Sequence, residues 1–146
     1  MPIYEVCALI HQASPANGER ELLFVDFRST DSHGKKSEWW TRFPGGTNRL
    51  YPAELPEDIC NRVVWEEAKL GYQLSMPFWS SETDERVYFA FLINSIDCTG
   101  ELRKGILLHD GVEVSPPYWA SARSLRYPLF PPHQAPLLAG MQYLGL

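Results

Sequence analysis

The segment from Gly45 to Leu70 constrains the fold most, because it pairs a Gly-Gly turn with a helical pattern of regularly spaced charges. Pro56 suits the first turn of a helix, and the acidic residues after it suit the positive end of the helix dipole. We therefore predict a helix over residues 56–70. Its buried side would carry Ile59, Cys60, Val64 and Ala68.

Two adjacent glutamates, Glu66 and Glu67, lie three and four residues after Val63 and about one turn after Arg62. Residues at these spacings share one face of a helix. Carboxylates crowded on one face suit Mg²⁺, which takes one or two carboxylates and leaves its other positions to water and phosphates. The alternative is a surface ion pair between Arg62 and Glu66, which would contribute about 0.3–0.5 kcal/mol.

This spacing resembles the Nudix box, whose consensus is G-x5-E-x7-R-E-U-x-E-E-x-G-U, with U an aliphatic residue. Glu54 matches the first glutamate, Arg62 the arginine, and Glu66 with Glu67 the paired glutamates. The aliphatic positions are Val64 and Leu70. The resemblance implies an α/β (α+β) fold, a Nudix-type α/β/α sandwich with a mixed β-sheet between helices.

The chain departs from the consensus at three points. Val63 stands where the family usually has a metal-binding glutamate, and an aliphatic side chain cannot coordinate Mg²⁺. Lys69 replaces the glycine of the motif, and seven residues rather than five separate Gly46 from Glu54. The fold tolerates these changes, whereas metal chemistry depends on the lost carboxylate.

The resemblance implies roles for the matching residues. Glu66 and Glu67 would bind Mg²⁺ or Mn²⁺, which would bridge phosphates and activate a water molecule. Arg62 would orient a carboxylate, and Glu54 would be a secondary ligand or support the loop. The implied reaction is Mg²⁺-dependent hydrolysis of a diphosphate bond in a nucleoside diphosphate linked to another moiety.

Further candidates lie outside the helix. Glu113, six residues before Trp119, is a possible replacement metal ligand, and Asp110 is a second acid in that region. Gly45 and Gly46 could offer backbone N–H groups to phosphate, and Arg42 could meet its charge. Surface solvation is the alternative for each charged residue, and a tight turn for the glycine pair.

Loss of the carboxylate at Val63 leaves other functions open. A Nudix domain without catalysis could act as a nucleotide-binding or protein-interaction module, and a purely structural domain is a third possibility. The resemblance also makes a homodimer plausible. An apolar pocket beside Val63 would favour binding over hydrolysis.

Composition bounds the remaining classes. With 146 residues, the chain has the length of a single domain, residues 1–146. A net charge of −5 argues against a surface that coats nucleic acid. The three cysteines form no metal-binding pattern and indicate reduced thiols. The N-terminus lacks the features of a signal peptide and no run is long enough to span a membrane, so we expect a cytoplasmic protein.

Outside the motif, the pattern of apolar residues predicts the other elements. We expect strands over residues 3–11, 21–28, 39–43 and 87–96, the last being central in the sheet. Residues 80–86 suggest a turn, 120–125 a short helical turn, and 131–144 a C-terminal helix. Residues 105–114 are ambiguous.

Overall fold

The central strand β1 (Ile3–Ala13) is apolar on both faces, so the sheet must be covered on both sides. The structure, a computed structural model, describes residues 2–109 and 111–146. The other strands are β2 (Arg20–Ser29), β3 (Trp40–Arg42), β4 (Gly45–Thr47), β5 (Gly71–Tyr72), β6 (Met76–Glu82), β7 (Arg86–Asn94), β8 (Cys98–Thr99), β9 (Leu107–His109), β10 (Val112–Val114) and β11 (Tyr118–Ala120). The helices are α1 (Pro56–Ala68) and α2 (Gln134–Leu144), with short 3₁₀ turns at Ser95–Asp97 and Pro131–His133.

The main sheet is mixed, with strand order β6-β7-β1-β2-β10-β9. Strands β1 and β7 are parallel, whereas β1 with β2 and β6 with β7 are antiparallel. Strand β4 pairs with β1, and strands β3 and β11 pair with β2. Strands β5 and β8 form a separate two-stranded sheet. The mixed sheet confirms the predicted fold class.

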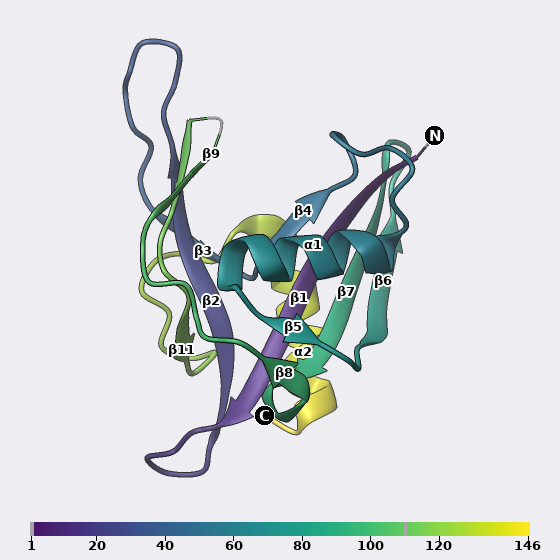
Figure 1. Cartoon of the computed structure of the whole chain (residues 1–146), viewed down its shortest axis with the longest axis vertical. Coiled ribbons are helices and arrows are strands. Elements are labelled where there is room, and N and C mark those ends of the chain that lie inside the picture. Colours follow the sequence, from purple (N-terminus) through teal and green to yellow (C-terminus); the bar gives the residue numbers. More distant parts are fainter. Residues whose placement is uncertain (1, 110) are drawn as a thin grey trace.

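The two helices cover opposite faces of this sheet, with α1 in front and α2 behind in Figure 1. Because side chains alternate along a strand, Val6, Ala8 and Ile10 of β1 join the core under α1. Cys7 and Leu9 join the second core, which α2 covers. The predicted helical stripe of Ile59, Cys60, Val64 and Ala68 is buried as expected. Among the described residues, no helix is long and apolar enough to cross a membrane.

Strands β1 and β2 separate soon after their hairpin, and this separation makes room for a site. They pair only through His11–Ala13 and Arg20–Leu22. Towards the other end, β4 lies beside β1, while β3 and β10 lie beside β2. The separated strands are visible in Figure 1, where α1 crosses in front of them. The C-terminal end of α1 and strand β10 both line the cavity that lies between them.

Two sequence predictions need correction, and one ambiguous segment is now assigned. The helical turn expected at residues 120–125 is shorter in the structure: Ala120 ends the strand Tyr118–Ala120, and a single turn follows in which the N–H of Ser124 donates to the Ser121 carbonyl. Part of the predicted turn at 80–86 belongs to β6, which extends to Glu82 beside β7. The ambiguous segment 105–114 contains the antiparallel strands β9 and β10. Strands β10 and β11 both pair with β2, far away in the chain, so local composition did not reveal them.

Helix α1 ends where the backbone turns left-handed at Lys69, with φ of 60°. Lys69 is the one residue other than glycine with positive φ among the described residues. Its N–H donates to the Trp65 carbonyl, and the Arg103 side chain donates to the Glu67 carbonyl at 2.8 Å. The motif resemblance expects glycine at position 69, and the positive φ gives the physical reason.

We predict that Lys69→Gly raises the free energy of unfolding by about 1 kcal/mol, because glycine adopts the left-handed backbone conformation of this position without the steric cost of a Cβ atom. Urea unfolding followed by circular dichroism measures the change. Lys69→Ala is the matched control, because it removes the same side chain but keeps the strained Cβ. Equal stabilisation by both substitutions would contradict this explanation.

The C-terminal segment is anchored to the sheet through His133. Its Nδ1 accepts a hydrogen bond of 3.1 Å from the N–H of Phe43, and its ring stacks on Phe43 at 5.7 Å. Burial, followed by the charge of Arg42, lowers the pKa of His133 to about 3. The neutral imidazole is therefore the form that holds this contact.

This contact predicts a pH dependence of stability. The unfolded chain takes up a proton on His133 near its ordinary pKa of about 6.5, whereas the folded protein does not until near pH 3. The contribution is thus complete above about pH 6.5 and declines as the pH falls, by about 2 kcal/mol between pH 7 and pH 5. Denaturant unfolding of wild type and His133→Gln at both pH values measures it. A variant that loses as much stability as wild type over this interval would refute the assignment.

Candidate functional site

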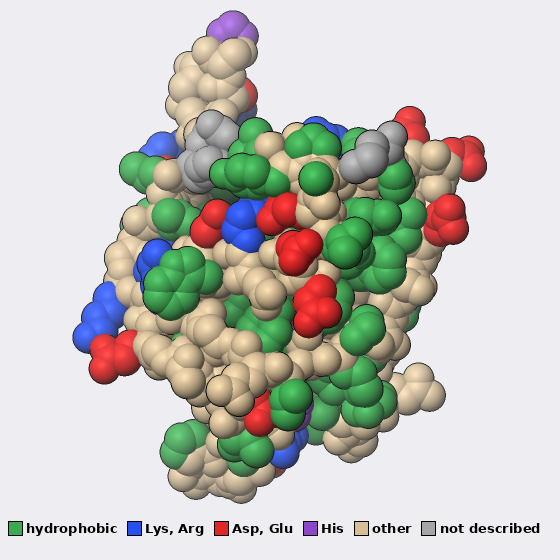
Figure 2. Space-filling view, turned by 45° about the vertical axis from the view of Figure 1, so that its right-hand side comes forward, with side chains coloured by type: hydrophobic (Ala, Val, Ile, Leu, Met, Phe, Trp, Pro, Cys, Tyr) green, Lys and Arg blue, Asp and Glu red, His purple; other side chains and the backbone are tan. Residues whose placement is uncertain are grey.

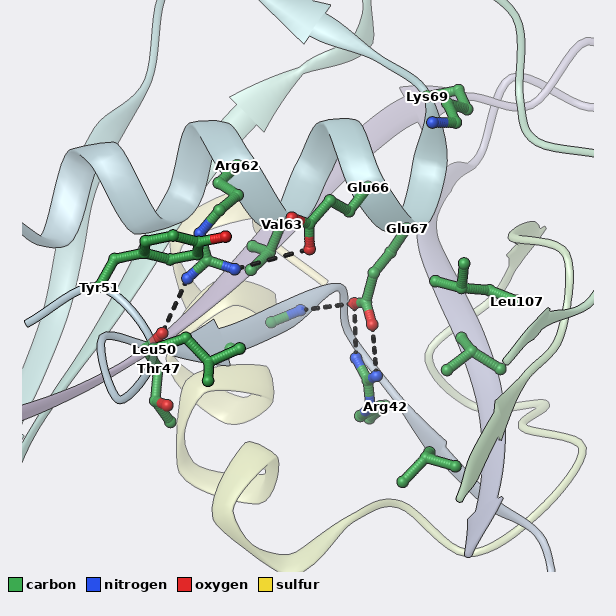
Figure 3. Close-up of a pocket in the computed structure, with 14 residues that line it drawn as sticks. Arg42, Thr47, Leu50, Tyr51, Arg62, Val63, Glu66, Glu67, Lys69 and Leu107 are labelled. Carbon is green, nitrogen blue, oxygen red and sulfur yellow. Dashed lines mark hydrogen bonds and ion pairs between the residues drawn. The ribbon is translucent and has the colours of Figure 1, made fainter. Parts of the chain in front are cut away.

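A cavity of about 470 Å³ occupies the space between α1, β4 and the β9–β10 hairpin. Its lining combines charged side chains of α1 and β3, the backbone of β4, and an apolar wall from the hairpin (Figure 3). Figure 2 shows acidic and basic side chains close together on the face that carries α1, with hydrophobic side chains on either side. The lining residues are Arg42, Gly45, Gly46, Thr47, Leu50, Tyr51, Arg62, Val63, Glu66, Glu67, Lys69, Leu107, Val112 and Val114.

The strongest polar contact in the cavity joins Glu67 of α1 to Arg42 of β3. The two guanidinium Nη atoms of Arg42 donate to the two carboxylate oxygens of Glu67 at 2.7 and 2.6 Å. The N–H of Gly45 donates to Oε1 of Glu67 at 2.9 Å. The side chain of Arg42 is only 13% exposed, and that of Glu67 only 10%. This forked geometry is the arrangement in which arginine binds a carboxylate most strongly.

Arg42 keeps its positive charge in this setting. Burial alone would lower its pKa, but the attraction of the Glu67 carboxylate and the hydrogen bonds to it outweigh burial and raise the pKa. Nη1 also donates to the Phe43 carbonyl at 2.9 Å, and the guanidinium lies 5.1 Å from the centre of the Phe27 ring. The group is therefore held on several sides.

Arg62 forms a second charged contact, at the other end of the cavity. Its Nε and Nη2 donate to the Glu54 carboxylate, the shortest bond being 2.9 Å, and Nη2 also donates to the Thr47 carbonyl at 2.8 Å. These hydrogen bonds to Glu54 are the main reason that the pKa of Arg62 is raised. The guanidinium lies 5.1 Å from the centre of the Tyr51 ring. Arg62 thus ties the loop before α1 to the helix.

Glu66 differs from its neighbour Glu67 in exposure. Its side chain is 51% exposed, and its contact with Arg62 is a longer ion pair of 3.5 Å at i,i+4 spacing. The surface pair that the sequence offered as an alternative is therefore present. Lys69 lines the same rim, with its Nζ 5.1 Å from the centre of the Trp65 ring.

The glycines of β4 allow close contact with β1 and α1. A Cβ atom on Gly45 would lie 2.7 Å from the Val6 carbonyl oxygen, and one on Gly46 would lie 2.7 Å from Cγ1 of Val63. Val63 itself is only 2% exposed. The side chain that replaces the consensus carboxylate therefore fills the space over Gly46.

Comparison with solved structures identifies this architecture. The MutT Nudix hydrolase of Burkholderia pseudomallei superposes with a TM-score of 0.67 at 17% identity, over 95% of this chain and 98% of that chain. The Nudix domain of Shewanella oneidensis NrtR, solved with ADP ribose, gives 0.63 at 18% identity, over 99% and 89%. The chain has the Nudix fold.

Other Nudix structures agree with this result. A MutT/Nudix family protein of Listeria innocua superposes with a TM-score of 0.59 at 17% identity, over 99% of this chain and 96% of that chain. No family model matches the sequence, and no curated protein matches it. The resemblance stated from residues 45–70 is thus confirmed at the level of the Nudix fold.

The Nudix fold implies a divalent cation, and the residues of this cavity do not fit one in the observed arrangement. Val63 offers no ligand atom, and Glu67 already binds Arg42 and Gly45 through its two oxygens. The Nudix motif has acidic residues at positions 63, 66 and 67 of this face. Position 63 is valine here, Glu67 is paired, and Glu66 has a carboxylate that is half exposed. In the part of the chain that the structure describes, no group of three or more metal-binding side chains comes together.

The structure does not bring Glu113 to this site. Val112 and Val114 line the cavity, so the alternation along β10 directs Glu113 to the other side of the strand. There its carboxylate contacts Lys36 at 2.7 Å and Arg28 at 3.2 Å, and these contacts lower its pKa. The structure therefore places Glu113 outside the cavity, and its role as a replacement ligand stays a prediction. Asp110 lies outside the described residues.

Two predicted substrate contacts also take a different form. The N–H of Gly45 donates to Glu67, and Arg42 is paired with the same carboxylate, so neither is free for phosphate as the structure stands. Glu54 is not among the residues that line the cavity, because it lies beyond Arg62. Glu66, Glu67, Arg62 and Gly46 do line it, as the sequence suggested.

The sequence analysis missed the apolar wall and the arginine that fixes it. The wall consists of Leu107, Val112 and Val114. The signal available in the sequence was the alternation of apolar and polar residues in this segment, which is typical of a short hairpin with one apolar face. Arg103 joins the wall to α1, since it donates to the Glu67 carbonyl at 2.8 Å and to the Ser115 carbonyl at 2.6 Å. Nothing in the local sequence distinguishes Arg103 from an exposed arginine.

We predict that Glu67→Ala lowers the free energy of unfolding by about 3 kcal/mol, because it leaves the buried Arg42 guanidinium without its partner. Glu66→Ala is the matched control and should change stability by less than about 0.5 kcal/mol, because that carboxylate is exposed. Denaturant unfolding measures both. Similar losses in the two variants would show that the Arg42–Glu67 pair does not stabilise the fold as described.

Proposed function

We propose that the cavity binds a nucleotide-type small molecule and that the chain acts as a Nudix-fold binding domain. The observation that carries this proposal is the Arg42–Glu67 pair, which occupies the carboxylate expected to bind metal. A volume of about 470 Å³ suits a small ligand. The pocket beside Val63 is partly apolar, and an apolar pocket at this position favours binding over hydrolysis.

The two sides of the cavity suit two parts of such a ligand. Leu107, Val112 and Val114 form an apolar surface on which a base or sugar can pack. Opposite them, Lys69 adds positive charge at the rim, while the guanidinium of Arg62 is paired with Glu54 and Glu66. The Nudix domain of Shewanella oneidensis NrtR was solved with ADP ribose, and that similarity of fold supports a ligand of this class.

Metal-dependent hydrolysis of a diphosphate bond is the second candidate. The observation that favours it is that Glu66 and Glu67 line the same cavity at adjacent positions of α1. Hydrolysis by this route would require Glu67 to leave Arg42, and we therefore place it second. Mg²⁺ and Mn²⁺ are the cations to test.

We predict that ADP ribose binds to the wild-type protein and that Leu107→Trp weakens binding at least about tenfold, because the larger side chain fills the cavity. Leu108→Trp is the matched control: it lies next in β9, is 72% exposed and does not line the cavity, so binding should be unchanged. Isothermal titration calorimetry measures both affinities. ADP and AMP serve as additional probes.

The same samples distinguish the two candidates. Chromatography of the ligand after incubation with Mg²⁺ or Mn²⁺ should recover ADP ribose intact. Cleavage into AMP and ribose phosphate, lost in Glu67→Gln, would establish hydrolysis in place of binding alone. If none of the three probes binds, or if Leu108→Trp weakens binding as much as Leu107→Trp, the cavity is not the nucleotide site.

Two predictions from the sequence remain proposals. We expect a cytoplasmic protein, and a homodimer is the assembly that the Nudix resemblance suggests. Light scattering of the purified protein would establish its oligomeric state.

A further inference from the structure

We infer that Arg42 supplies the positive charge that a divalent cation would otherwise bring to Glu67, so that this cavity binds its ligand without a metal ion. This inference rests on the proposed function for its ligand, but its claim about metal binding concerns the protein alone. It follows from the contacts of Glu67, from the way Arg42 is held, and from the side chains around the pair.

The contacts of Glu67 leave little capacity for a metal. Its carboxylate has about four lone-pair positions. Oε1 accepts hydrogen bonds from Arg42 and Gly45, and Oε2 accepts one from Arg42. A cation that used both oxygens would have to displace all three donors. A cation that used the remaining position would lie next to the positive guanidinium, which repels it.

Arg42 is held in place by contacts other than Glu67. Its Nη1 donates to the Phe43 carbonyl at 2.9 Å, and its guanidinium packs at 5.1 Å from the Phe27 ring centre. Its charge also contributes to the lowered pKa of the buried His133. Displacement of the guanidinium by a metal would therefore leave several partners unsatisfied in a largely buried region, in addition to the lost ion pair.

The surrounding side chains do not compensate for Glu67. Val63 fills the space over Gly46 with a methyl group, so this position offers no oxygen ligand to a cation. Glu66 is half exposed and faces Arg62 at 3.5 Å. Each of the two adjacent glutamates thus faces an arginine: Glu67 binds Arg42 in a buried fork, and Glu66 forms an exposed pair with Arg62.

The charge of Arg42 is fixed in position, whereas the charge of an exposed lysine or arginine moves with its side chain. A guanidinium bound on both Nη atoms to one carboxylate presents a fixed charge whose position does not depend on the solution. The cavity therefore keeps the same electrostatic character in the presence and absence of divalent cations. A ligand recognised here should bind equally well in Mg²⁺ and in a chelator.

The test measures Mn²⁺ binding to the ligand-free protein by electron paramagnetic resonance of the free ion. Wild type should leave the Mn²⁺ signal unchanged at millimolar protein. Arg42→Met frees the Glu67 carboxylate beside Glu66, so Mn²⁺ affinity should rise at least about tenfold. Arg42→Lys is the matched control: it retains the charge and should resemble wild type. Circular dichroism establishes that each variant is folded.

Mn²⁺ binding by wild type that Glu67→Gln abolishes would overturn the inference. A folded Arg42→Met that binds no more Mn²⁺ than wild type would also overturn it, because Arg42 would then not be what keeps the metal away. If Arg42→Met does not fold, the wild-type protein decides alone: an unchanged Mn²⁺ signal supports the inference, and Mn²⁺ binding that Glu67→Gln abolishes overturns it.

A second arm separates this inference from the proposed function. ADP ribose is titrated into wild type in Mg²⁺ and in EDTA, and equal affinities support the inference. Binding that requires Mg²⁺ would leave the proposed ligand intact and overturn the inference. Absence of binding in both solutions would overturn the proposed function, while the Mn²⁺ result would still decide whether Arg42 replaces a metal.

Discussion

The Arg42–Glu67 ion pair links the three elements that define the site. Glu67 belongs to α1, Arg42 to β3, and the N–H that completes the carboxylate belongs to Gly45 of β4. Strands β3 and β4 pair with different partners, β2 and β1, which separate beyond their hairpin. In the described part of the chain, the other polar contact between α1 and these strands is the hydrogen bond from Arg62 to the Thr47 carbonyl of β4, and it does not reach β3. A buried pair with forked geometry gives these elements one relative position, and its partners cannot be removed singly without cost.

Helix α1 serves two purposes at once, and its spacing explains how. The face with Ile59, Cys60 and Val64 packs on the sheet, while the next face carries Val63, Glu66 and Glu67. Glu67 lies where these faces meet, so it is buried although it is charged. Burial strengthens its hydrogen bonds and makes an unpaired state expensive. Glu66 lies one position earlier and is half exposed, which explains why two adjacent glutamates differ in their environment.

The sequence revealed the elements whose cause is local. The helix over Pro56–Ala68, the strands β1, β2 and β7, and the C-terminal helix follow from periodicity and from proline and glycine positions. The strand at Tyr118–Ala120 and the wall at Val112–Val114 exist because they pair with β2, far away in the chain, so local pattern could not establish them. The candidate site divides in the same way. Glu66, Glu67 and Arg62 were found from spacing, whereas the partner of Glu67 lies 25 residues away in β3 and required the fold.

The departures from the Nudix motif act together rather than separately. A carboxylate at position 63 would face the backbone of Gly46. The side chain of Val63 lies so close to this backbone that a Cβ atom on Gly46 would be 2.7 Å from its Cγ1 atom. With valine there, the negative charge of the helix face is reduced by one, and one guanidinium suffices to neutralise the buried glutamate that remains. Lys69 then adds a positive charge at the rim, at the expense of a left-handed backbone that glycine would adopt more easily. Under the inference that Arg42 takes the place of a metal, these substitutions act in one direction: each replaces an acidic or neutral group near Glu67 by an apolar or basic one.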